Sequence, residues 1–273
     1  MAQARALPGD WRESARSIVP LGLLALAAAL PLLRLPVLIA LVAGTSVAIA
    51  RHAPVRWSWA AGIPVAISLA WGVWPEPPIA VDGSDCANAF SPIALWRAAE
   101  AIVVLAALAV LATTMHARRS SLGLRRPSRA VVRWSILGFV VVGPLAFIIG
   151  PLLARPFFGQ IEYGGAIVGA LLPALLFAVA NGTMEELAYR GALLGWSAKV
   201  IGVWPAVVGQ AVVFGLAHSG SDVVSNGLPL VLALGAGGLL AGIITVRTRS
   251  IMLPIALHIG FDIPIYFAFA CAS

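Results

Sequence analysis

The amino-acid sequence predicts an all-α fold, a polytopic transmembrane helical bundle of about eight or nine spans with a cytoplasmic N-terminus. The first reason is composition: 60% of the 273 residues are hydrophobic and only 11% are charged, whereas soluble domains carry about 25% charged residues. The second is length, because apolar runs of roughly 17–25 residues recur along the chain. A helix of that length crosses a hydrocarbon layer of about 30 Å. The third is the distribution of basic residues.

The apolar runs locate the expected spans, and one of them passes directly into a polar motif. These spans lie near residues 18–33, 35–50, 57–74, 93–115, 134–154, 164–183, 203–219, 228–246 and 251–270. In this topology all basic residues except Arg34, Arg97 and Arg155 fall at or near the inner side, as the positive-inside rule requires.

The net charge of +7 therefore reflects membrane topology, and we expect no nucleic-acid partner. The basic run at residues 116–133 is interpreted first as a cytoplasmic loop, and second as a site for lipid head groups or a partner. The run separates an N-terminal four-helix membrane section, residues 1–115, from a rear membrane core, residues 134–273. In the front section, Arg97 and Glu100 lie three residues apart on one helical face and are expected to pair.

The two cysteines carry little information. Cys86 and Cys271 both fall on the outer side in this topology, so a disulfide is conceivable, but two unpaired thiols are favoured and no zinc-binding cysteine spacing occurs. The strong excess of arginine over lysine is typical of a GC-rich bacterial gene, and we expect an integral protein of the bacterial plasma membrane.

Three polar clusters lie in or at the ends of the apolar runs of the rear section. An ionisable group within a span costs roughly 2.5–3.5 kcal/mol on insertion scales, so such groups usually face a cavity and carry function. A lone histidine or a lone Glu–Arg pair is more often structural, but a set of six on three helices indicates a functional site. The six candidate residues are Glu185, Glu186, Arg190, His218, His258 and Asp262.

Helical spacing assigns partners within the clusters. At about 100° per residue, Arg190 lies near Glu186 on the helix surface and far from Glu185. Glu186 is thus the expected ion-pair partner, whereas Glu185 has no local cation and suits a general base. His258 and Asp262 are four residues apart and share a helical face.

Membrane depth adds one condition. Glu185 and His218 reach a common depth only if the helix that carries Glu185 continues through its motif to about Lys199. We expect that helix to bend near Asn181–Gly182 or Pro173.

The ordered motifs resemble the CPBP family of membrane proteins, which includes CAAX-type prenyl proteases and bacteriocin-processing or self-immunity proteins. The family pattern is E-E-x-x-x-R, then F-x-x-x-H, then H-x-x-x-N or D. Here these read "EELAYR" from Glu185, "FGLAH" from Phe214 and "HIGFD" from His258. The resemblance covers about residues 164–270 and the "LGLRRP" stretch at 122–127.

The resemblance implies an intramembrane endopeptidase that cleaves a peptide or membrane-associated protein. By analogy, Glu185 with His218 activates a water, while His258 and residue 262 stabilise the oxyanion. Glu186 and Arg190 would support these groups. No cofactor is favoured, although glutamate, histidine and aspartate could bind zinc, and a zinc-dependent protease stays open as an alternative.

Two positions depart from the family pattern. Tyr189 stands where many relatives carry Phe, and Asp262 stands where prenyl-protein proteases carry Asn. Since a carboxylate donates a hydrogen bond only when protonated, the second change favours a peptide substrate other than a prenylated CAAX protein. Two further hypotheses are a non-catalytic scaffold or immunity protein of the same fold, and a proton- or cation-coupled transporter.

Overall fold

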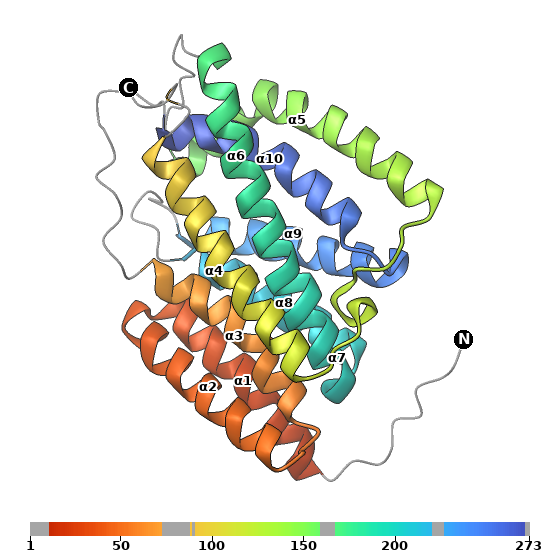
Figure 1. Ribbon diagram of the computed structural model, residues 1–273. Coiled ribbons are helices and arrows are strands. Elements are labelled where there is room, and N and C mark those ends of the chain that lie inside the picture. Colours follow the sequence, from red (N-terminus) through yellow and green to blue (C-terminus); the bar gives the residue numbers. More distant parts are fainter. Residues whose placement is uncertain (1–10, 73–87, 89–90, 159–166, 220–226, 271–273) are drawn as a thin grey trace.

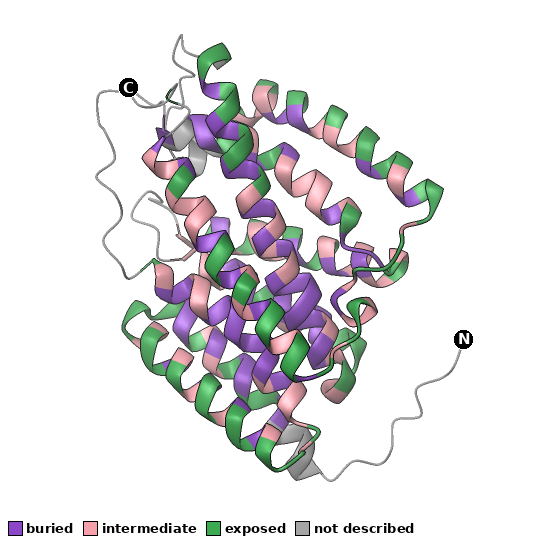
Figure 2. Cartoon of the chain, viewed as in Figure 1, coloured by how far each residue is buried: buried purple, intermediate pink, exposed green. Residues whose placement is uncertain are grey.

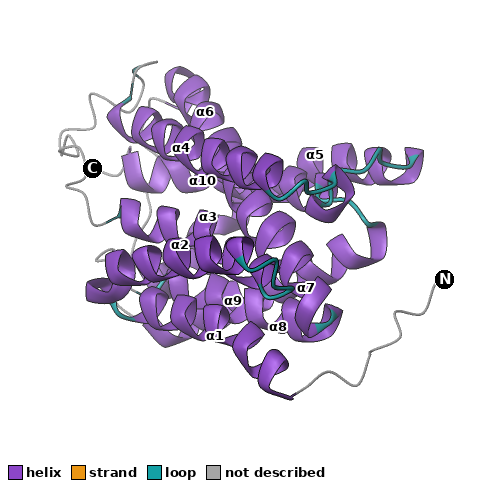
Figure 3. Cartoon of the chain, turned by 60° about the horizontal axis from the view of Figure 1, so that its bottom comes forward, coloured by secondary structure: helices purple, strands orange, loops and turns teal. Residues whose placement is uncertain are grey.

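The computed structural model describes residues 11–72, 88, 91–158, 167–219 and 227–270. Helices, turns and loops make up this part of the chain, and it contains no strand (Figure 3). The α-helices are α1 (Trp11–Ala29), α2 (Arg34–Ala50), α3 (Arg56–Trp71), α4 (Pro92–Thr114), α5 (Arg129–Phe158), α6 (Ile167–Glu185), α7 (Gly195–Ile201), α8 (Val203–Ala217), α9 (Gly227–Thr248) and α10 (Met252–Ala270). Short 3₁₀ turns are η1 (Pro31–Leu33) and η2 (Arg119–Leu122), and η3 (Glu186–Leu194) is a π-helix.

Five helices of the described chain are long and apolar enough to cross a membrane, so the protein is an integral membrane protein. The long segments are Pro31–Ala50, Pro92–Thr114, Arg129–Leu152, Val168–Ile201 and Gly227–Thr248. Three further apolar helices, Ser17–Ala29, Val203–Ala217 and Met252–Phe267, are shorter. Every expected span thus has a helix near it, but length and composition identify five of them as spans.

The helices form one bundle in which the front and rear sections share a core. Helices α1, α2 and α3 pack together, α4 lies along α6, and α10 lies against both α5 and α6 (Figure 1). Side chains from the first four helices meet side chains of the π-helix and α8 in one buried cluster, which appears as the purple interior in Figure 2. The front section therefore packs directly against the segment that carries the polar motif.

That segment is one continuous helix, Ile167–Ile201, made of α6, η3 and α7, which we call the motif helix. The expected continuation to about Lys199 is confirmed, and Pro173 lies inside α6. The π-helical geometry over Glu186–Leu194 was not predicted. Such segments occur frequently at functional sites, and here eight of the nine π-helical residues are buried.

The connection before α5 holds the motif helix in place. η2 packs directly against Gly195, where a Cβ atom would collide with the carbonyl oxygen of Ser121. The Trp196 indole donates to the Ser121 hydroxyl at 3.1 Å. Gly123 adopts a left-handed conformation with φ of 68°, and its carbonyl accepts a hydrogen bond from the Ile251 amide at 3.2 Å. The "LGL" stretch thereby ties the motif helix to the start of α10.

The structure also tests the predicted Arg97–Glu100 pair and the predicted basic loop. The Arg97–Glu100 pair is confirmed, with 2.7 Å between Arg97 Nη1 and Glu100 Oε2. The loop expected at residues 116–133 ends earlier, because its last residues belong to α5, which begins at Arg129. Cys86 and Cys271 lie outside the described residues.

Candidate active site

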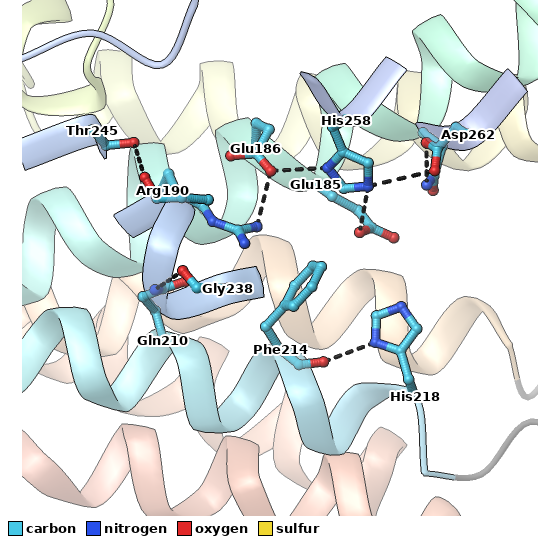
Figure 4. A network of polar contacts seen from close by, with 12 residues as sticks. Glu185, Glu186, Arg190, Gln210, Phe214, His218, Gly238, Thr245, His258 and Asp262 are labelled. Carbon is cyan, nitrogen blue, oxygen red and sulfur yellow. Dashed lines mark hydrogen bonds and ion pairs between the residues drawn. The ribbon is translucent and has the colours of Figure 1, made fainter. Parts of the chain in front are cut away.

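The candidate site forms where the motif helix, α8 and α10 meet (Figure 4). Gly182 makes this approach possible, because a Cβ there would lie 3.1 Å from the Ile259 side chain and 3.4 Å from the His258 Cβ. A larger residue would push α10 away from the motif helix. One turn later the motif helix presents Glu185 and Glu186 to the same stretch of α10.

Glu186 is the buried anchor of the site, with a side chain only 2% exposed. Its Oε1 lies 3.0 Å from Nη1 of Arg190, which is also 2% exposed, so the ion pair predicted from spacing is present. The pair is a charge contact, since Nη1 is not aligned for a hydrogen bond. The same Oε1 lies 2.9 Å from His258 Nδ1. A carboxylate paired with arginine accepts hydrogen bonds, so Nδ1–H is the donor.

His258 lies among three carboxylates. While Nδ1 donates to Glu186, Nε2 lies 3.6 Å from Glu185 Oε2 and 3.6 Å from Asp262 Oδ1. The expected convergence of His258 and Asp262 is therefore observed. The contact of His258 with both glutamates, 72 and 73 positions away in sequence, was not expected. It places the imidazole between the anchored carboxylate Glu186 and the less constrained Glu185.

His218 lies at the end of α8, and Figure 4 shows its second ring nitrogen turned toward Glu185 and His258. Its Nδ1 is 2.8 Å from the Phe214 carbonyl oxygen. A carbonyl only accepts hydrogen bonds, so Nδ1 carries the proton, and neutral His218 has a free lone pair on Nε2. Within the described chain no ion pair within 4 Å joins His218 to Glu185. The expectation that Glu185 and His218 act together on a water does not require a direct contact between them, and it stays a prediction.

Phe214 links the polar groups from one side. The Arg190 guanidinium carbon lies 4.3 Å from the centre of its ring, a cation–π distance. The two histidine rings also contact it, at centroid distances of 5.0 Å for His218 and 6.2 Å for His258. Tyr189 packs edge-on against it at 5.0 Å. Phe214 thus orients both histidines as well as the arginine, a role that its motif position alone did not indicate.

Asn181 is a site residue that sequence reasoning missed. Its Nδ2 donates to Asp262 Oδ2 at 2.9 Å, and both side chains are buried. Asn181 was identified only as a possible bend point. Its position four residues before Glu185 could have indicated a site residue, because this spacing places an uncharged polar group on the same helical face as Glu185.

The front section also brings charge toward the site. Glu100 on α4 is buried, accepts a hydrogen bond from Ser68 at 2.6 Å and pairs with Arg97. This pair is close enough for Glu100 to interact electrostatically with Glu185, and Arg97 with Asp262.

The donor set does not fit a metal ion as it stands. Among the described residues, no group of three His, Cys, Asp or Glu side chains is placed to hold one. We therefore derive no step through a metal.

Comparisons with known proteins identify the fold family of this region. Residues 167–264 match the family model of the Rce1-like type II CAAX prenyl endopeptidases. Comparison with curated proteins and with solved structures gives no match. The matched region contains all six candidate residues and begins with the motif helix. Residues 167–264 are therefore a domain of the Rce1-like type II CAAX prenyl endopeptidase (CPBP) family.

Proposed function

We propose that this protein is an intramembrane endopeptidase that cleaves a peptide or membrane-associated protein with a water activated by Glu185 and His218. The observation that carries the proposal is Glu185 Oε2, a buried atom that accepts no hydrogen bond from the described protein. It faces His258 at 3.6 Å. With the free Nε2 of His218, it provides two acceptors on different helices.

Two acceptors of this kind suit a nucleophilic water. They can accept hydrogen bonds from both O–H groups of the water. An oxygen lone pair is then directed at the scissile carbonyl carbon. Glu185 accepts one proton as the carbon–oxygen bond forms. The same proton then passes to the leaving nitrogen as the peptide bond breaks, giving a carboxylic acid and an amine.

His258 and Asp262 are the proposed oxyanion stabilisers. When protonated, His258 presents its Nε2–H beside Glu185, from where it can donate to the carbonyl oxygen on which the negative charge develops. Glu186 and Arg190 act on the reaction through His258, because Glu186 fixes which ring nitrogen points away from the substrate. They are positioning residues.

The direct test is a cleavage assay with purified full-length protein and a peptide library, read by mass spectrometry. Peptide products from wild type that are absent with Glu185→Gln support the proposal. Intact peptides with both proteins would favour the non-catalytic scaffold or immunity hypothesis.

The metal-free mechanism predicts that activity survives prolonged chelation. Purified active protein should also hold no stoichiometric zinc by elemental analysis, since no step here requires a Lewis acid. Loss of cleavage on chelation, with recovery on adding zinc, would make the zinc-dependent alternative the better account.

Asp262→Asn should retain substantial activity, whereas Asp262→Ala should lose most of it. Asparagine keeps an oxygen that can accept from Asn181 and gains N–H donors beside the oxyanion position. The measurement is the ratio of kcat/KM between the two variants. An asparagine variant as inactive as the alanine variant would contradict the donor role and favour a carboxylate ligand to a metal.

We also propose that the shorter helices cross the membrane, giving about eight or nine spans in a bacterial plasma membrane with a cytoplasmic N-terminus. The native cysteines provide a test. After reduction, Cys86 and Cys271 should react with a membrane-impermeant thiol reagent in intact cells, while a cysteine introduced as Ser120→Cys should not. Labelling of the cysteine at position 120 alone would indicate the opposite topology, with the N-terminus outside.

A further inference from the structure

An arginine-lined hollow lies at the start of α5, outside the site described above. Its volume is about 490 Å³, and its lining residues are Arg126, Pro127, Arg129, Val132 and Arg133. Arg129 and Arg133 lie one helical turn apart, so their side chains share a face. Pro127 fixes the backbone φ between Arg126 and the helix. Three guanidiniums thus line one small space.

The positive charge of this hollow has no counter-charge in the described chain. All three arginines are exposed, and no described carboxylate lies within 4 Å of them. The sequence contains no acidic residue between Glu100 and Glu162. Clustered arginines without acidic neighbours bind phosphate groups well, because each planar guanidinium can donate two hydrogen bonds to one phosphate.

The surface beside the hollow is apolar. In the segment Arg129–Leu152 only 17% of the apolar window is buried, the lowest share among the five long apolar helices of the described chain. Ile136 and Val140 continue the face of Arg129 and Arg133 along α5, and they are 60% and 57% exposed. Figure 2 shows this outer side of α5 as largely exposed. Trp134, 60% exposed, follows Arg133 directly near the start of α5, and tryptophan is enriched at membrane interfaces.

We propose that Arg126, Arg129 and Arg133 form a binding site for one anionic phospholipid, with its phosphate in the hollow and an acyl chain along Ile136 and Val140. The combination of an uncompensated positive hollow and an adjoining apolar strip at the end of a span matches a lipid better than a soluble anion. The site does not depend on the proposed peptidase activity. It lies on the helix that supports α10, since Gly138 and Gly143 allow α5 to approach Leu257 and Gly260 closely.

The test measures lipid binding to the purified full-length protein in a neutral detergent, by thermal unfolding and native mass spectrometry. Phosphatidylglycerol should raise Tm and appear as one retained lipid, because a ligand of the folded state stabilises it. Phosphatidylcholine and inorganic phosphate at equal concentrations should do neither. The variant Arg126→Gln/Arg129→Gln/Arg133→Gln should bind phosphatidylglycerol roughly 100-fold more weakly.

The matched control removes three exposed arginines elsewhere. Arg51→Gln/Arg119→Gln/Arg247→Gln has the same net charge as the hollow variant and should bind like wild type. Equal loss in both variants would show nonspecific attraction and overturn the proposal. Equal binding of both lipids would also overturn it, as would full competition by inorganic phosphate. If the triple variant does not fold, Arg133→Gln alone should weaken binding about fivefold.

Discussion

Glu185→Gln is expected to reduce peptide cleavage by about 10²–10⁴-fold while leaving the protein folded in the membrane. Glutamine has nearly the same shape but cannot take a proton from water. The substitution should be structurally mild, because Glu185 has no arginine partner and its Oε2 makes no hydrogen bond with the described protein. The measurement is kcat/KM together with Tm.

The comparison that isolates catalysis is Glu100→Gln. Glu100 is another buried carboxylate near the site, but it is already engaged by Arg97 and Ser68. We expect Glu100→Gln to lower Tm more than Glu185→Gln and to lower kcat/KM less. A Glu185→Gln enzyme with most of the wild-type activity would remove Glu185 as the base.

Contacts within one helix could be predicted from the sequence. Glu186–Arg190, Arg97–Glu100 and His258–Asp262 are each separated by three or four residues, so helical geometry alone brings the partners together. Such pairs require only that the segment be helical, which the apolar runs made clear.

Contacts between helices could not be predicted in the same way. The His258–Glu186 and Asn181–Asp262 contacts span 72 and 81 positions. They depend on the position of α10 along the axis of the motif helix. The two helices pack closely at Gly182. The π-helical stretch also escaped prediction, because a run of apolar residues does not distinguish π-helical from α-helical hydrogen bonding.

Glu186→Gln is expected to lower stability as well as activity, unlike Glu185→Gln. The glutamine oxygen can still accept the hydrogen bond from His258 Nδ1, so the substitution mainly removes the charge. Arg190 would then be a guanidinium only 2% exposed with no carboxylate beside it. Breaking a buried ion pair on one side costs about 3–5 kcal/mol, which should lower Tm by on the order of 10 °C. Tryptophan fluorescence can follow unfolding, since the chain has nine tryptophans.

A second substitution tests whether the stranded charge causes that loss. In Glu186→Gln/Arg190→Met, methionine can occupy much of the arginine volume against Phe214 without a charge. This double variant should recover most of the lost Tm, since replacing both partners of a buried pair is far less costly than removing one. Its activity should stay low, because Glu186→Gln removes the charged acceptor of His258 Nδ1 in both variants. Equal Tm values for Glu186→Gln and Glu185→Gln would refute the partner assignment. No recovery in the double variant would place the cost in packing around Arg190 instead of in its charge.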